Sequence, residues 1–514
     1  MNRILTLSGL AATSSILMTT TALADISASE VWQAWQEDAA RMGMTLSANT
    51  QETNAGVDLS ALEFTVTIPQ FGEMEAPAEI RLNIGEVSLN ENDGAVSVIW
   101  PDSQQGVVSV VYGKDGGALS FEGTTSGRAS VISGSVDEMI YDISLDDMSW
   151  KVSDWSVTGN DISTQDLAKF VFELSVLAEG LTAKTTVNRM DGWHAVSTGT
   201  TAKSSYDFLV DSGTDEGRQA TTQTQTGGAY EFSLTLPDKI DFTTPEGTVA
   251  ALQAGLALSM QGTVDDVQQQ QTQVTPMGEV NSNIVASDLE YAITANQDLV
   301  KLTGVYGETQ LDLSGGPIPP VTINASGAGV ELTSPLVADG SRARYMISLN
   351  DFTLNDEIWG IFDPTAVLAR DPAQLTLDLS ADPVWKIDIL DLAAWDAVGP
   401  DNLPLAPTDI RLDAFELTAA GASITGTGEM KVNYDDVASG GDPVPAGHIK
   451  LAASGVNGLM DNLVKMGFLP EQQAMGARMM MGLIAVPGEG EDTLKSRIEM
   501  TEEGHILANG MRLK

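Results

Sequence analysis

The chain has 514 residues, 71 acidic and 26 basic, which gives a net charge of −45 at neutral pH. This charge repels nucleic-acid phosphates and anionic lipid surfaces, so the composition excludes nucleic-acid binding. The absence of cysteine excludes disulfides and a thiol nucleophile, and a hydrophobic content of 42% argues against general disorder. We interpret the dispersed acidic residues as a solvated surface, with binding of calcium or another cationic ligand as the alternative.

The first residues have the features of a secretory signal peptide. Arg3 supplies a positive start, residues 4–18 are mildly apolar, and small residues precede Asp25. The apolar stretch is shorter than the roughly 20 residues of a membrane-spanning helix. We therefore expect cleavage between Ala24 and Asp25, which removes residues 1–24 as the signal peptide. The mature chain would have no transmembrane segment and would reside in the periplasm, with an extracellular location as the alternative.

A capped helix and a series of strands follow. Ser27 and Glu30 form the pattern of a capping box, and Gly43 suits a C-terminal cap, so we predict a helix between them. Beyond it, apolar residues recur at every second position, which is typical of half-buried strands. Such runs are Leu62, Phe64, Val66 and Ile68; Ile80, Leu82 and Ile84; and Val96, Val98 and Trp100. Asp-Gly pairs at 93–94, 115–116, 191–192 and 339–340 predict the tight turns of an antiparallel meander.

Helices are predicted to interrupt this meander. Apolar residues at helical spacing indicate helices over residues 163–179 and 244–260. Near the C-terminus, the pattern predicts a helical pair over 456–466 and 471–484, followed by a hairpin over 493–513. These helices would pack their apolar stripes on one face of the sheet.

Two polar segments bear on domain organisation. Residues 219–226, rich in Thr and Gln, fit either a loop or an exposed strand. Residues 265–273 contain four consecutive glutamines and favour a flexible boundary. We therefore predict an N-terminal β-rich half (25–264), a polar loop or linker (265–277) and a C-terminal β-rich half (278–514) that ends in the helical pair and the hairpin.

An internal similarity relates the two halves. Tyr141–Ser149 resembles Tyr345–Thr353, as a duplication would leave, although the residues involved are common enough here for chance to be the alternative. The predicted fold class is β-rich α+β: long, curved, antiparallel meander sheets with a few amphipathic helices packed on one face, and with two duplicated halves as an open option.

Residues that could carry out catalysis or hold a metal are scattered. The histidines, His194, His448 and His505, are isolated, and no zinc, nucleophile-elbow or phosphate-binding motif is present. Acidic pairs at 146–147, 265–266 and 435–436 could serve a glycosidase, but neighbours on a strand point to opposite faces, so we interpret them as surface charge. The cluster Asn90–Gly94 lacks the spacing of an EF-hand and fits a hairpin turn. We predict no enzymatic activity, no cofactor and no metal site.

One segment is more distinctive. Trp359, Phe362 and Asp363 precede Pro364, and a second Asp-Pro step follows at 371–372. An Asp before a proline favours turn or extended geometry. We interpret the segment as a structural corner, with a ligand-contacting corner formed by Trp359, Phe362 and Asp363 as the alternative.

Three segments, Val31–Gln36, Trp359–Ala373 and Gly504–Gly510, resemble the family of exported alphaproteobacterial proteins known as domain of unknown function 2125. The resemblance spans nearly the whole mature chain and implies a compartment and a fold, but no active-site residue. A more distant similarity is to AsmA-type envelope proteins. It rests on Leu412, Phe415, Leu417, Ala419–Ala422, Ile424, Gly426 and Gly428.

Three functions follow as hypotheses. The first is a non-enzymatic envelope protein that binds a lipid or another apolar component on the concave face of its sheet. The second is a structural or scaffolding protein that recruits envelope protein partners. The third is a carbohydrate-active enzyme whose carboxylates meet only in the folded protein.

The signal peptide gives the first testable prediction. We expect the exported protein to begin at Asp25, because the small residues before it suit the signal peptidase. The intact mass of the protein recovered from the cell envelope measures the cleavage position. A mass that includes residues 1–24 would contradict the prediction.

Overall fold

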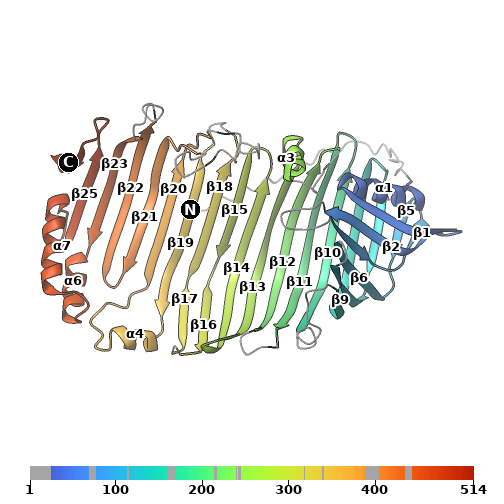
Figure 1. The fold of residues 1–514 in the computed structure, drawn as a ribbon, viewed down its shortest axis with the longest axis horizontal. Coiled ribbons are helices and arrows are strands. Elements are labelled where there is room, and N and C mark those ends of the chain that lie inside the picture. The colour runs from blue at the N-terminus through green and yellow to red at the C-terminus, as the bar shows by residue number, and fades with distance from the viewer. Residues whose placement is uncertain are drawn as a thin grey trace, which may run out of the picture.

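The computed structural model describes residues 25–68, 77–112, 115–158, 170–213, 217–238, 240, 245–317, 319–337, 341–385, 387, 398, 405–434 and 443–514. Within these residues, 27 strands form one antiparallel sheet along the whole molecule (Figure 1). The strands lie across the long axis and pair mainly with their neighbours in the chain. The predicted β-rich α+β class and the antiparallel meander are confirmed.

The described helices are α1 (Ala28–Arg41), α3 (Pro245–Gln253), α4 (Asp356–Phe362), α6 (Val456–Lys465) and α7 (Glu471–Ile484). The first strands are β1 (Met44–Thr53), β2 (Gly56–Ile68), β3 (Ala78–Asn83), β4 (Val87–Asn92), β5 (Ala95–Ile99), β6 (Ser103–Tyr112), β7 (Asp115–Ser126), β8 (Ala129–Gly134) and β9 (Glu138–Thr158). The long central strands are β10 (Val171–Asn188), β11 (Trp193–Asp211), β12 (Arg218–Leu236), β13 (Ala257–Thr275) and β14 (Gly278–Ala295).

The remaining strands are β15 (Leu299–Tyr306), β16 (Thr309–Gly315), β17 (Val321–Ala325), β18 (Gly327–Pro335), β19 (Ala343–Leu354), β20 (Ala373–Ala381), β21 (Asp409–Ala419), β22 (Ala422–Asn433), β23 (Val444–Ser454), β24 (Val486–Pro487), β25 (Thr493–Met500), β26 (Ile506–Ala508) and β27 (Met511–Arg512). In three places, two consecutive strands lie end to end and pair with the same neighbouring strand. Both β7 and β8 pair with β9, both β15 and β16 with β14, and both β17 and β18 with β19.

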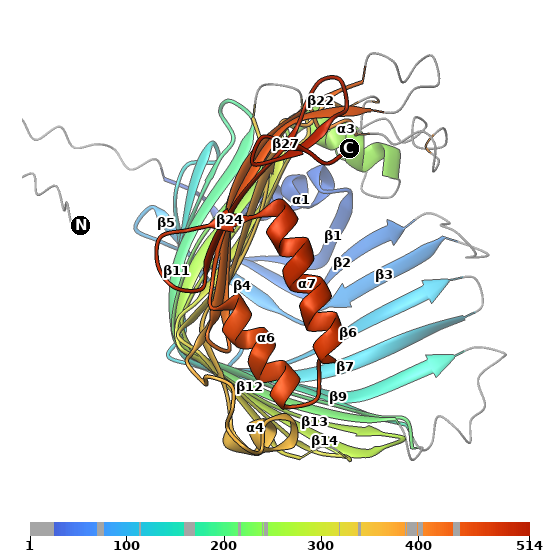
Figure 2. The same ribbon diagram turned by 90° about the vertical axis from the view of Figure 1, so that its left-hand side faces the viewer.

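The sheet is curved, and its concave face opens to one side when the molecule is viewed along its length (Figure 2). Helices α1 and α3 lie on the concave side, and α6 and α7 lie at the C-terminal end of the sheet. The central strands between α3 and α6 have no described helix in front of them in Figure 1. The helices therefore cover the concave face at its ends and one edge.

The buried core lies on this concave side. Val31 and Trp32 of α1 pack with Leu59, Leu89 and Ile132 of the N-terminal strands. A smaller cluster joins Ala251 of α3 to Trp193, Ala195 and Leu236 of β11 and β12. Because these helices lie on the concave side, the strand residues that they contact mark which face of the sheet is concave.

A line of bends crosses the middle of the long strands. The pairing of β12 with β13 is interrupted at Gly227, which has φ 65°. The register of the two strands is the same before and after this interruption. Gly180 and Asp288 also have positive φ, at 60° and 50°. We call this line the crease. It consists of Asp146, Gly180, Ala202, Gly227, Asp265 and Asp288, which lie on β9 to β14.

The crease shifts the alternation of side chains by one residue. On β14 the buried Ala286 and the half-buried Leu289 are three positions apart, with polar Ser287 and Asp288 between them. In β13 the same spacing separates Val264 from Val267. A regular strand would place such residues on opposite faces. The residue added at the crease keeps the apolar side chains on the concave face of both arms of the sheet.

Several predicted elements are confirmed. Helix α1 has the capping box formed by Ser27 and Glu30, and α6 and α7 match the predicted helical pair. Asp93 and Gly94 form a turn with φ 49° and 79°, and Gly192 in the turn between β10 and β11 has φ 105°. The polar segment 219–226 is a strand, one of its two predicted options.

The predicted linker is wrong. Most of residues 265–277 belong to β13, and Gln268–Gln271 pair with β12 on one side and β14 on the other. Hydrogen bonds of the backbone hold this segment, so its side chains can be polar without weakening the pairing. The two predicted halves are therefore parts of one continuous sheet.

Two predicted helices also need correction. Residues 171–179 form part of β10, because apolar residues at every second position pair with both β9 and β11; residues 163–169 lie outside the described residues. Helix α3 ends at Gln253 and β13 begins at Ala257, so the predicted helix is too long.

One predicted Asp-Gly turn is also wrong. Asp115 pairs with Tyr112 and begins β7, so the Asp115-Gly116 pair is part of a strand. The predicted turn at Asp339-Gly340 lies outside the described residues.

The crease gives a prediction on stability. A Cβ at Gly227 would lie 1.9 Å from Oδ2 of Asp265, and φ at this position is positive. We expect Gly227→Ala to lower the free energy of unfolding by about 1–3 kcal/mol, measured by urea denaturation.

Gly228→Ala is the matched control. A Cβ at Gly228 would lie 3.7 Å from its nearest neighbour, the carbonyl oxygen of Thr201, and the φ of Gly228 lies outside the left-handed region. Its effect should be smaller, and Asp265→Ala should recover part of the loss caused by Gly227→Ala. Equal stability of the two glycine variants would contradict the role of the crease.

Candidate apolar binding face

Apolar side chains continue along the concave face beyond the helices. Residues that pair across antiparallel strands lie on the same face. Ala195 of the core pairs with Leu234, and the series continues through Leu258 and Ala295 to Val300 of β15. Val300 therefore lies on the concave face. We use the name apolar face for six side chains that are 36–43% exposed: Val300, Leu302, Val330, Leu332, Tyr345 and Leu417.

Three members of the apolar face are direct neighbours across strands. Leu302 of β15 pairs with Leu332 of β18, and Leu332 pairs with Tyr345 of β19. Side chains in such positions are about 5 Å apart at Cβ, so these three form a continuous surface. Contiguous exposed apolar surface can serve for binding, so we treat the apolar face as a candidate site.

The opposite face of the same strands is charged. Arg344 of β19 forms ion pairs with Glu331 and Asp378, each at 2.8 Å, and Lys301 lies 3.6 Å from Glu331. The hydrogen bond that Arg344 donates to Asp378 raises the pKa of its guanidinium. On β15, β18 and β19, the concave face therefore carries the apolar face, and the convex face carries these ion pairs.

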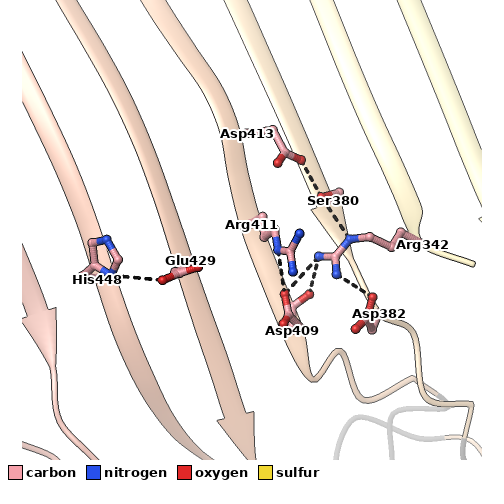
Figure 3. Close-up of polar contacts among 8 residues, drawn as sticks. All are labelled: Arg342, Ser380, Asp382, Asp409, Arg411, Asp413, Glu429 and His448. Atoms are coloured by element: carbon pink, nitrogen blue, oxygen red, sulfur yellow. Dashed lines mark hydrogen bonds and ion pairs between the residues drawn. The ribbon is translucent and has the colours of Figure 1, made fainter. Parts of the chain in front are cut away.

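A second group of polar contacts is shown in Figure 3, and the pairing of Arg344 with Ser380 and of Ser380 with Arg411 places it on the same convex face. Arg342 contacts Asp382 at 2.6 Å and Asp409 at 3.2 Å, and Asp409 also contacts Arg411 at 3.1 Å. The group also includes Ser380, which donates to Asp413, and His448, whose Nδ1 lies 3.7 Å from Glu429.

This group connects strands, and its Asp409 does not have the raised pKa of an acid catalyst. Burial raises the pKa of Asp409, but the hydrogen bond from Arg342 and the charge of Arg411 outweigh it, so its pKa lies below the usual value. An acid catalyst at neutral pH needs a raised pKa. Because Asp409 is held ionised by arginines, we assign the group a role in joining β19, β20 and β21.

The other residues singled out from the sequence do not converge. His194 is on β11, where Nδ1 lies 2.9 Å from Oγ1 of Thr235, whereas His448 is on β23 and His505 follows β25. Asn90–Gly94 is the hairpin between β4 and β5. Across the described part of the chain, no group of three His, Cys, Asp or Glu residues could hold a metal ion.

Two acidic pairs belong to the crease. Asp146 and Asp265 are crease residues, and Asp147 and Asp266 accept hydrogen bonds from Ser126 and Thr226. The third pair, at 435–436, lies outside the described residues. The first two pairs thus have a structural reason: two consecutive polar residues mark the position where the alternation shifts.

The segment with Trp359, Phe362 and Asp363 forms a corner between β19 and β20. Asp363 has no exposed surface, and its carboxylate accepts hydrogen bonds from the backbone N–H groups of Val367 at 2.8 Å and Leu368 at 2.9 Å. The Trp359 and Phe362 rings are 4.9 Å apart, and the Arg370 guanidinium lies over Trp359.

These contacts suit a structural corner, and they bear on the alternative of a ligand-contacting corner. The carboxylate of Asp363 is shielded and bonded to backbone, so it is not placed to contact a ligand. Burial raises its pKa, but the two backbone hydrogen bonds and the charge of Arg370 outweigh it, and the pKa lies below the usual range. Ligand contact by Trp359 and Phe362 stays a prediction.

The start of the described chain adds one contact. Ala24 lies outside the described residues, and Asp25 is the first residue described. The N–H of Ile26 donates to the carbonyl of Gly94, and Ile26 is buried in the core. The packed structure thus begins next to the predicted cleavage position.

Comparison with models of protein families, with curated proteins and with solved structures found no match. Among the described residues, no helix has the length and apolar character to cross a membrane. The resemblances to exported proteins and to AsmA-type proteins stay predictions.

The corner gives a prediction on pH. The pKa of Asp363 is lower in the folded protein than in the unfolded chain, so its ionised form stabilises the fold above about pH 4, and this contribution is lost as the pH falls through the folded-state pKa. We expect Asp363→Ala to lower the melting temperature by several degrees at neutral pH and by less at about pH 3.

Asp356→Ala is the control, because Asp356 is exposed and pairs with Arg370 on the surface. Melting curves followed by circular dichroism measure both variants. If Asp363→Ala were no less stable than Asp356→Ala at neutral pH, the corner would not depend on this carboxylate.

Proposed function

We propose that the protein is an exported, periplasmic component of the cell envelope that binds a lipid or another apolar ligand on the concave face of its sheet. The observation that supports this most is the apolar face, where aliphatic and aromatic side chains of adjacent strands are exposed on the inside of a curved sheet. Binding sites for small apolar ligands are concave and mostly apolar.

The distribution of charge supports the same proposal. Lys301, Glu331, Arg344 and Asp378 lie on the opposite side of the strands that hold the apolar face. A dry structural core would be covered on its apolar side, whereas Leu332 and Tyr345 are 43% and 42% exposed. A ligand on this face would remove that surface from water, a gain of about 25 cal/mol for each Å².

One observation favours the second function, a scaffold for envelope proteins. Helix α7 exposes Met475, Met479 and Met480 by 63–69% at the C-terminal end of the sheet. Methionine-rich helix faces suit protein partners because the side chain adapts its shape. A scaffold would retain a protein partner in stoichiometric amount, whereas a carrier would retain a small apolar molecule.

The third function, a carbohydrate-active enzyme, gains no support from the described acids. A glycosidase needs one carboxylic acid with a raised pKa. Within the described part of the chain, the acids whose pKa departs from the usual value are all shifted downward; they are Glu30, Asp312, Asp363, Asp409, Asp492 and Glu503.

The first experiment is mass spectrometry of the natively purified protein, before and after organic extraction. A lipid-sized adduct that disappears on extraction would support the proposal. A mass equal to that of the bare chain, with no uptake of added lipid, would overturn it and favour the scaffold.

A pair of variants locates the ligand. Leu332→Glu places a carboxylate on the apolar face, where burial under a ligand is costly, so we expect the affinity for an apolar ligand to fall at least tenfold. Thr333→Glu is the control on the other face, where the new carboxylate would lie opposite Lys301 and Arg344. Titration with a fluorescent fatty acid measures both; equal loss in the two variants would contradict binding on the concave face.

A further inference from the structure

Three hydrogen-bond donors near the N-terminal end of the sheet have no partner among the described residues. They are Nε2 of Gln104, Oγ1 of Thr125 and Nε of Arg128. Gln104 and Thr125 are only 8% and 9% exposed. A buried polar group without a hydrogen bond costs free energy, so such groups are rare and call for a specific explanation.

The strands place these donors together beside the crease. Gln104 of β6 pairs with Gly123 of β7, and Thr125 is two residues further along β7, on the same face as Gly123. The ring of Trp150 lies over Gly123, where a Cβ would be 2.4 Å from the indole. Arg128 lies between β7 and β8, directly after Gly127, which has φ 60°.

Aromatic rings surround the group. The guanidinium of Arg128 lies 4.9 Å from the centre of the Trp100 ring, and Trp100 packs against the core on the concave side. Phe121 and Trp150 are in edge contact at 5.3 Å. The polar atoms are thus on the concave side of the sheet and are bordered by apolar surface.

Arg128 is unusual in this acidic protein. The ion pairs of the described residues do not include it, although the chain has 71 acidic residues. Burial lowers the pKa of its guanidinium, and no carboxylate offsets this effect. Among the described residues, no carboxylate therefore neutralises its charge.

We propose that Arg128, Gln104 and Thr125 bind an oxyanion, a phosphate or a carboxylate, that forms the head of an amphipathic ligand. This inference rests on the proposed function, because the apolar part of the same ligand would lie on the concave face. All three side chains can donate hydrogen bonds, and arginine matches the geometry of phosphate and carboxylate oxygens. Surrounding side chains shield the free donor atoms, so binding requires the long Arg128 side chain to change its rotamer.

The test compares two ligands with the same chain, hexadecyl phosphate and hexadecanol, titrated against the purified protein and followed by native mass spectrometry. We expect the wild type to bind hexadecyl phosphate at least tenfold more tightly, because hydrogen bonds to a charged group are the stronger ones. Arg128→Gln should abolish this preference and leave the affinity for hexadecanol unchanged. The double variant Gln104→Leu with Thr125→Val should reduce the preference without removing a charge.

Arg218→Gln is the control, because Arg218 is an exposed residue at the start of β12, and it should retain the preference. Equal affinity of the wild type for the two ligands would overturn the oxyanion site while leaving the apolar site in place. If the wild type bound neither hexadecyl phosphate nor hexadecanol, the proposed function itself would be overturned. If inorganic phosphate alone binds as tightly as hexadecyl phosphate, the oxyanion site stands and its link to an apolar ligand is overturned.

Discussion

An extended strand sends its side chains alternately to its two faces, and a strand that bends sharply must still keep its apolar side chains on the inner side of the bend. In this protein the crease satisfies both requirements. One residue is added to the alternation where each long strand bends, and at Gly180 and Gly227 that residue has a backbone conformation that glycine adopts at little cost. Without this shift, one arm of every long strand would turn its polar side chains inward.

The concave face and the functional proposals depend on this shift. On one side of the crease, pairing across strands aligns apolar side chains from Ala195 under α3 to the exposed apolar face on β15, β18 and β19, and the shift keeps the apolar side chains of the other arm on the same face. The convex face can then hold the ion pairs of Arg344 and Arg342, which face water. Near the N-terminal end, the unpaired donors around Arg128 add a polar group to the same concave side.

Local signals predicted the elements that local interactions determine. The capping box of Ser27 and Glu30 predicted α1, and apolar residues at helical spacing predicted α6 and α7. The same approach was wrong for β10, because a short apolar run fits a strand as well as a helix and the pairing with β9 and β11 decides between them. It was also wrong for Gln268–Gln271, where neighbouring strands on both sides hold a polar segment in place.

The internal similarity between Tyr141–Ser149 and Tyr345–Thr353 has a structural explanation that does not need duplication. Both segments have two polar residues between apolar ones, Leu145 and Met148 in β9, and Leu349 and Phe352 in β19. Val264 and Val267 show the same spacing at the crease in β13. This spacing is the feature of the sequence from which the crease could have been predicted. It explains the acidic pairs at 146–147 and 265–266 that otherwise suggested catalysis.

The sequence by itself determined the acidic, cysteine-free composition, the β-rich class, the meander and the helices whose caps and stripes are local. Only the tertiary structure decided that the sheet is continuous, that it bends along one line, and which apolar residues stay exposed on its concave side. The physical reason is that alternation along a strand defines two faces but not which of them is inside. That choice depends on pairing across strands and on where α1 and α3 pack.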